Sequence, residues 1–245
     1  MSYREVIPHR ALRPFVDRLW TDDAVGAEPR RVLPDGCIDL LITEGRAFVV
    51  GAMTRPLVLE AGAPARVVAV RFRPGGAVRF LREDAGALTD RQVDAEELGL
   101  GWARALAERD LTTGALEHAL LARLPGPPEP LVAHAVGLLF AEAPPSIDQL
   151  ARRIGWSRQH LGRTFRAHVG LSPKQLGRVA RLQRTLARLQ GGAPALAQEA
   201  AALSYFDQAH MNREFHALVG VTPAAAAAGS IFPIRSLLDE PWIAT

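Results

Sequence analysis

The sequence has few of the residues on which several classes of protein depend. Its 245 residues include a single cysteine, Cys37, which excludes a disulfide scaffold and a thiolate metal cluster. There is no apolar run long enough to span a membrane, and the first residues show no signal-peptide pattern. One lysine stands against 28 arginines, a bias typical of GC-rich bacterial genomes. We therefore expect a cytoplasmic protein without a membrane partner.

The length and the proline distribution predict two domains. A chain of 245 residues exceeds the usual size of one domain. Residues 124–130 hold four prolines and a glycine, a composition that cannot continue a helix and marks a stiff linker. We predict an N-terminal domain over 1–124, a linker over 125–130, a helical domain over 131–228 and a tail over 229–245.

The C-terminal half contains one motif twice. Residues 160–165 return as residues 210–215, and the glycine and proline at 170 and 173 return at 220 and 223, so that the offset is 50. Upstream of each motif the copies align with an offset of 49. A fixed period indicates a repeated structural unit, and two copies suit a tandem of small modules with turns of unequal length.

Each copy predicts a helix, a tight turn and a second helix. In the first copy Ser146 and Ser157 are the expected N-caps, and Gly155 and Gly170 the expected helix ends. In the second copy Leu196, Ala200 and Leu203 belong to the first helix, and the second helix begins near Asp207. Residues 173–189 have apolar side chains at helical spacing and predict one helix that connects the copies.

The second helix of each copy has a polar face. Arg, Gln and Asn are the side chains that bond base edges in the major groove, and arginine also neutralises phosphate. One such polar face is explained by exposure to solvent alone. Two such faces, each on the second helix of a copy, favour an interface with DNA. The candidate DNA-binding residues are Ser157, Arg158, Gln159, Gly162, Arg163 and Arg166 in the first copy, and Asp207, Gln208, Asn212, Arg213 and His216 in the second.

The charge is distributed as a DNA-binding domain requires. The whole chain carries a net charge of +3, residues 1–130 carry −2, and residues 131–223 carry +6 with 11 basic and 5 acidic residues. Positive charge on the repeats is the electrostatic footprint for phosphate. We expect arginines of the connecting helix, at 178, 181, 184 and 188, to contribute to it. His160 and His210 lack further ligands at coordinating spacing and are expected to pack or cap.

The C-terminal half resembles the DNA-binding domain of the AraC/XylS family of bacterial transcription regulators. The motifs that carry the resemblance are IDQLA at 147–151, GWS at 155–157, HLGRTF at 160–165, GLSP at 170–173, YFDQAH at 205–210, REF at 213–215 and GVTP at 220–223. The resemblance implies two helix-turn-helix subdomains with recognition helices in adjacent major grooves. Ser204, Ala209 and the alanines after Pro223 depart from the family pattern, which implies a weaker grip by the second subdomain.

The N-terminal domain reads as short strands followed by helices. Strands are expected over 31–33, 37–43, 47–50, 57–59 and 66–72, and helices over 77–82 and within 93–123. The fold class is therefore α+β, with a mainly β sheet or small barrel before an all-α domain. Residues 33–40 and 71–77 resemble the sensor regions attached to AraC-type domains. Candidate effector-binding residues are Asp35, Asp39, Arg71 and Arg73, with paired strand residues as the alternative.

The predicted function is a DNA-binding transcription regulator without enzymatic activity, metal or cofactor. Its expected partners are double-stranded promoter DNA, which would make it nucleoid-associated, and a small-molecule effector; RNA polymerase and a second copy of the chain are open alternatives. Two other classes compete: a DNA-repair or redox-sensing protein that uses Cys37, and a protein-binding adaptor with a degenerate second module. Repair chemistry needs an activated thiolate, and no local motif supplies one.

Overall fold

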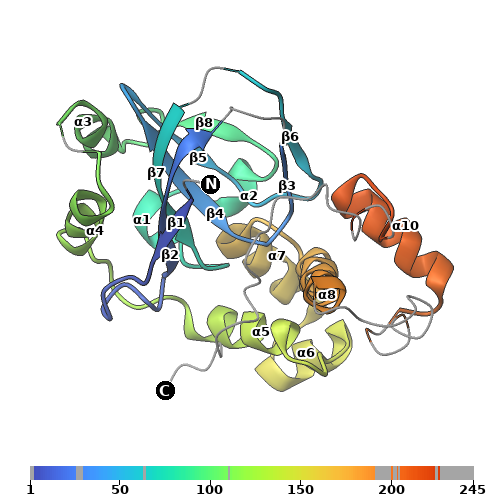
Figure 1. The fold of residues 1–245 in the computed structure, drawn as a ribbon. Helices are drawn as coiled ribbons and strands as arrows, with labels where there is room; N and C mark the ends of the chain where they lie inside the picture. The colour runs from blue at the N-terminus through green and yellow to red at the C-terminus, as the bar shows by residue number, and fades with distance from the viewer. Residues whose placement is uncertain are drawn as a thin grey trace.

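The computed structural model of the chain describes residues 3–25, 30–62, 65–109, 111–190, 200, 203, 205–223 and 226. Within these residues, all strands lie in the N-terminal half and the C-terminal half is helical (Figure 1). The α+β prediction is therefore confirmed. None of the helices in the described ranges is long and apolar enough to cross a membrane.

Two antiparallel sheets form the N-terminal part. An open six-stranded sheet has the order β1-β2-β7-β4-β5-β8, and β3 pairs with β6 in a separate two-stranded sheet. The strands are β1 (Arg4–Val6), β2 (Val16–Val25), β3 (Arg30–Val32), β4 (Ile38–Thr43), β5 (Arg46–Val50), β6 (Leu57–Leu59), β7 (Ala65–Phe72) and β8 (Gln92–Asp94). The five expected strands are confirmed within a residue at each end, whereas β1, β2 and β8 were missed.

The two faces of the large sheet have different surroundings. On β7, Val68, Val70 and Phe72 are fully buried in the main core, as their alternation predicted. On the other face, Ala69 packs with Val67 of the same strand and with Trp20 of β2. The β3–β6 pair lies on this second side, opposite the helices α3 and α4 (Figure 1).

In the part of the N-terminal half that the structure describes, four helices accompany the strands: α1 (Val78–Leu81), α2 (Ala85–Leu88), α3 (Gly101–Arg109) and α4 (Thr113–Leu121). The prediction of helix from Val93 onward is wrong at its start, because Val93 lies in β8 and pairs with Val49 of β5. Thr112 caps α4 by accepting a hydrogen bond from the Ala115 backbone.

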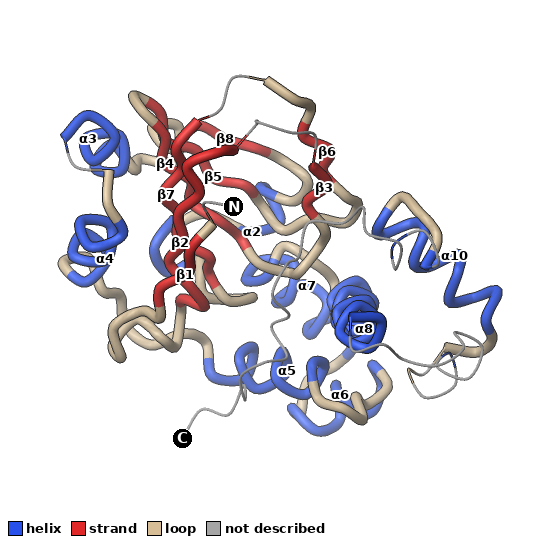
Figure 2. Tube along the Cα trace, viewed as in Figure 1, coloured by secondary structure: helices blue, strands red, loops and turns tan. Residues whose placement is uncertain are grey.

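The C-terminal part contains five helices in the described residues: α5 (Pro130–Phe140), α6 (Ile147–Ile154), α7 (Arg158–Val169), α8 (Pro173–Gln190) and α10 (Gln208–Val219). They lie to one side of the strands (Figure 2). The connecting helix is confirmed as α8. Of the first helix predicted for the second copy, Leu196 lies outside the described residues, while Ala200 and Leu203 are buried together with Tyr205 and Met211. The tail over 229–245 also lies outside them.

One hydrophobic core runs through both halves. It joins Ile38, Leu40 and Phe72 of the sheet to Val136 of α5 and Phe165 of α7. A continuous core means that the strands and the C-terminal helices stabilise one another, because the buried apolar area belongs to both. The domain boundary at 125–130 stays a prediction; residues 124–129 are non-helical and α5 begins at Pro130.

Candidate nucleic-acid interface and the cavity behind it

Hydrogen-bonded caps fix the first helix-turn-helix. Ser146 and Gln149 form a reciprocal capping box at the start of α6, and Gly155 ends that helix with φ 76°. Ser157 then starts α7 by accepting a hydrogen bond of 3.2 Å from the His160 backbone. Each of these caps was expected from the sequence. They set the angle between the two helices, because the chain between them has two residues, Trp156 and Ser157, after the left-handed glycine.

The second copy repeats this construction at α10. Asp207 accepts a hydrogen bond of 2.6 Å from the His210 backbone, as Ser157 does for His160. Each histidine also meets an aromatic ring edge-on: Trp156 lies 4.7 Å from His160, and Tyr205 lies 5.6 Å from His210, between ring centroids. Both imidazoles thus pack against an aromatic ring, and His210 Nδ1 also accepts a hydrogen bond from the Phe206 backbone. Among the described residues no group of three His, Cys, Asp or Glu could hold a metal ion.

The predicted DNA-binding side chains lie mostly on exposed faces of these helices. Leu161 and Phe165 of α7 and Met211 and Phe215 of α10 are fully buried. The opposite faces are open to solvent: Ser157, Arg158, Gln159, Arg163, Arg166, Asp207, Gln208, Arg213 and His216 are exposed, and Gly162 and Asn212 are half-buried. Arg158 forms an ion pair of 3.0 Å with Asp148 of α6, and both side chains are more than half exposed, so the pair can exchange for a phosphate at little cost.

Glu214 has a role that the motif did not suggest. Its side chain is 7% exposed and accepts hydrogen bonds from Arg178 at 3.1 Å and Arg181 at 2.9 Å, both of α8. Arg184 of the same helix donates to the carbonyl oxygens of Leu139 and Ala141, and burial lowers its pKa. Arg178, Arg181 and Arg184 therefore connect helices of the C-terminal part, a role that their expected contribution to the positive charge did not predict.

The N-terminal part contacts the ends of both candidate recognition helices. Gly170 ends α7, and its carbonyl oxygen accepts a hydrogen bond of 2.6 Å from Thr89 Oγ1. Gly220 is the equivalent residue after α10, and a Cβ there would lie 3.5 Å from Arg31 Nε of β3 and 3.5 Å from Pro56 Cγ. The glycines that end α7 and α10 thus both lie against residues of the N-terminal part.

A cavity of about 220 Å³ lies between the second face of the large sheet and the β3–β6 pair. Its walls are mainly apolar and come from β2, β4, β5, β7 and the pair itself. The lining includes Trp20, Val25, Val32, Leu41, Phe48, Val50, Met53, Leu57, Leu59 and Val67. Pockets with apolar walls and a few polar groups are the usual form of small-molecule sites.

Three of the four candidate effector-binding residues line this cavity, and they contact one another. Arg71 Nη2 lies 3.2 Å from Asp39 Oδ2, and Arg71 Nε lies 3.4 Å from Asp35 Oδ2. Burial raises the pKa of Asp39 to about 6, against the effect of Arg71. The fourth, Arg73, does not line the cavity but donates hydrogen bonds to the carbonyl oxygens of Arg13 and Val16.

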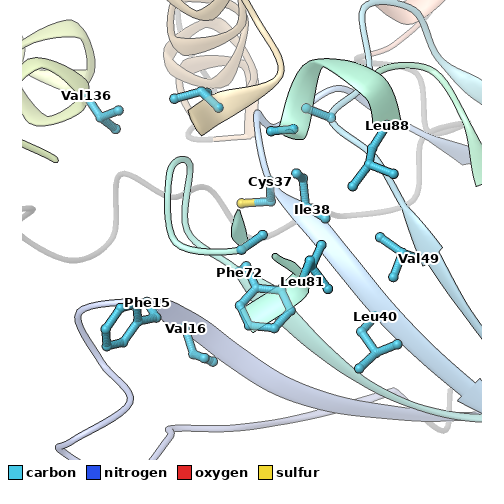
Figure 3. Close-up of a cluster of buried hydrophobic side chains, with 14 of the residues drawn as sticks. Phe15, Val16, Cys37, Ile38, Leu40, Val49, Phe72, Leu81, Leu88 and Val136 are labelled. Atoms are coloured by element: carbon cyan, nitrogen blue, oxygen red, sulfur yellow. The ribbon is translucent and has the colours of Figure 1, made fainter. Parts of the chain in front are cut away.

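Cys37 lies in the same cluster of buried core side chains as Ile38 and Phe72 (Figure 3). Its residue is 5% exposed, and burial raises the pKa of the thiol well above its ordinary value. The neutral thiol is a weak nucleophile. The burial of Cys37 therefore argues against a DNA-repair or redox-sensing protein that uses this thiol.

Comparison with known proteins finds two domain families in the chain. Residues 4–94 match a domain of unknown function, DUF6597, and residues 150–228 match a helix-turn-helix domain. A search of curated proteins finds no significant match. Among solved structures, the chain is similar to ToxT from Vibrio cholerae, with 10% identity, a TM-score of 0.43 and coverage of 94% of this chain and 98% of that one. It is also similar to the xylose-binding transcription activator XylR, with 18% identity, a TM-score of 0.37 and coverage of 59% and 41%.

Proposed function

We propose that the protein regulates transcription by binding promoter DNA with two recognition helices, α7 and α10. The proposal starts from the match of residues 150–228 to a helix-turn-helix domain. The observation that carries the proposal is the equivalence of these helices. Each is capped by an oxygen side chain, ends at a left-handed glycine and exposes polar residues on the face opposite its buried apolar side chains.

The two helices divide the work of recognition unequally. The exposed face of α7 has three arginines, Arg158, Arg163 and Arg166, whereas the α10 segment has Arg213 together with Asp207. Arginines provide most of the phosphate attraction, which carries little sequence information. We infer that α7 supplies the larger electrostatic contribution and that α10 adds base discrimination through Gln208 and Asn212.

The connecting helix α8 sets the distance between the two proposed recognition helices, α7 and α10. Glu214 of α10 is held by Arg178 and Arg181 of α8, and α8 packs against α5 and α7. A rigid connection favours two half-sites on one face of the DNA, about one helical turn, roughly 34–36 Å, apart.

We also propose that an effector in the cavity modulates DNA binding. The loop from Leu33 to Asp35 links the two sites: Asp35 lines the cavity, the Pro34 carbonyl oxygen accepts a hydrogen bond of 2.9 Å from Gln183 of α8, and Leu33 packs against Phe215 of α10. An effector changes the DNA affinity only if it binds two arrangements of these contacts with different strength. RNA polymerase and a second copy of the chain stay open alternatives as partners.

A direct test is selection of target DNA from a random duplex library, followed by binding titrations with the selected sequence. We expect specific binding by the wild-type chain that weakens steeply with salt, because phosphate contacts release counterions. Absence of any enriched sequence, with only salt-insensitive retention, would refute the proposal.

A further inference from the structure

We propose that the cavity binds a small organic cation, with an apolar body of about one ring and a short amine-bearing chain. This inference rests on the proposed function, in which the cavity holds the effector, and it names the chemistry of that effector. Three features of the cavity carry it: its size, the carboxylates in its wall and the aromatic pair beside them.

The size and the walls define the apolar body. An apolar protein cavity of about 150 Å³ is known to bind benzene. The cavity of about 220 Å³ here has room for a ring and a short chain. Leucine, valine and methionine side chains of β3, β4, β6 and the loop before β6 surround most of this space, so a ligand gains by burying its own apolar surface.

The charged groups in the wall favour a cation. The lining residues Asp35, Asp39 and Arg71 form one charged group, with two carboxylates against one guanidinium. Arg71 is already engaged by both Asp35 and Asp39, so this trio alone has an excess negative charge. An amine can approach the free lone pairs of Asp35 and Asp39, whereas a carboxylate ligand would face both at close range in a poorly hydrated site.

An aromatic pair stands beside the carboxylates. Tyr3 and Trp20 line the cavity with ring centroids 5.7 Å apart. Aromatic faces attract amines and quaternary ammonium groups, and tryptophan does so best.

The test compares three ligands of one shape by isothermal titration calorimetry on the full chain without DNA. The ligands are 2-phenylethylamine, 2-phenylethanol and 3-phenylpropionate, which are cationic, neutral and anionic at pH 7.5. We expect the amine to bind at least about tenfold more tightly than the other two, a difference of about 1.4 kcal/mol. Binding of the carboxylate as tightly as the amine, or binding of none of the three, would overturn the inference.

A pair of matched variants tests whether the preference for the amine depends on Asp39. Asp39→Asn should weaken binding of the amine at least tenfold and leave 2-phenylethanol unchanged within about twofold. Glu44→Gln makes the same kind of change at an exposed residue that does not line the cavity, and it should alter neither. An unchanged amine affinity in folded Asp39→Asn would contradict the inference, and if that variant does not fold, the three ligands on the wild-type chain decide alone. Because no DNA is present, a failure of amine binding is distinct from a failure to bind promoter DNA.

Discussion

Thr89 Oγ1 donates a hydrogen bond of 2.6 Å to the carbonyl oxygen of Gly170, and this bond joins the N-terminal part to the end of α7. The two residues are 81 positions apart. A Cβ at Gly170 would lie 2.9 Å from the Ala85 carbonyl oxygen, so the backbones of α2 and α7 approach each other at a position where only glycine fits. The sheet domain therefore positions α7 directly.

Removal of this hydrogen bond should loosen the contact. In Thr89→Val the Gly170 carbonyl loses its donor in a half-buried site, and we expect the free energy of unfolding to fall by about 1 kcal/mol. Urea denaturation measures this, with Thr113→Val in α4 as a control that makes the same change outside this contact. Equal stability of the Thr89→Val chain and the wild type would show that the bond does not hold the two parts together.

The exposed arginines should separate the two helices by function. Arg163→Ala on α7 and Arg213→Ala on α10 should each weaken specific binding by about 1–3 kcal/mol and relax the preference at the bases contacted, while loss of a phosphate contact lowers the salt slope by about 1. Arg158→Ala should act mainly through the salt slope. Fluorescence anisotropy over a range of salt concentrations distinguishes these effects, with the exposed Arg10→Ala as control. Wild-type binding by all three variants would mean that the interface lies elsewhere.

Glu214 should matter for the second half-site more than for the first. In Glu214→Gln the amide can no longer hold both Arg178 and Arg181 as charged partners, and we expect a loss of about 2 kcal/mol in stability, since hydrogen bonds to charged groups contribute about 1.5–3 kcal/mol. Footprinting should show weaker protection of the α10 half-site while the α7 half-site stays protected. The exposed Glu142→Gln is the control; equal loss at both half-sites would argue against a role in placing α10.

The ionisation of Asp39 should leave a signature in stability. Burial and Asp35 raise its pKa from an ordinary 3.8 to about 6, while Arg71 opposes the shift and Asp17 adds to it. The folded chain therefore holds this proton more tightly than the unfolded chain. The contribution of Asp39 to stability is greatest below about pH 4 and is lost as the pH rises through 6.

Chemical denaturation from pH 4 to pH 7.5 measures this contribution as the difference between the wild type and Asp39→Asn. The difference should decline up to about pH 6 and then level. The same comparison with Glu44→Gln should be flat. A constant difference for Asp39→Asn would show that the carboxyl titrates normally in the folded chain.

Local signals in the sequence predicted the C-terminal helices well. Ser146, Ser157 and Asp207 act as caps through bonds to backbone N–H groups three residues ahead, and such short-range chemistry is visible in a linear pattern.

By contrast, β2 was missed because Asp17, Arg18, Asp22 and Asp23 interrupt its apolar alternation. Two of these, Arg18 and Asp22, are nevertheless buried, since neighbouring strands and side chains cover them.

The contacts between the two parts of the chain had no local signal. Nothing in the sequence indicated that Thr89 would bond to Gly170, or Gln183 to Pro34. These pairs meet only in the folded chain. The burial of Glu214 could have been predicted from the sequence, because it lies three residues after Met211, on the apolar side of α10. Its partners Arg178 and Arg181 are spaced by about one helical turn on α8. Of the proposed effector residues, Arg73 was expected to share a face with Arg71, two positions before it, as strand alternation predicts. The strand β7 ends at Phe72, and Arg73 instead donates hydrogen bonds to the carbonyl oxygens of Arg13 and Val16.

The central claim is that two recognition helices read DNA as one rigid unit, and hydroxyl-radical footprinting of the wild-type chain on its selected target tests it most directly. We expect two protected segments on one face of the duplex, separated by about one helical turn of 10–10.5 base pairs. Binding should be lost when five base pairs are inserted between the segments, because half a turn places them on opposite faces. A single protected segment, or binding unaffected by the insertion, would contradict it.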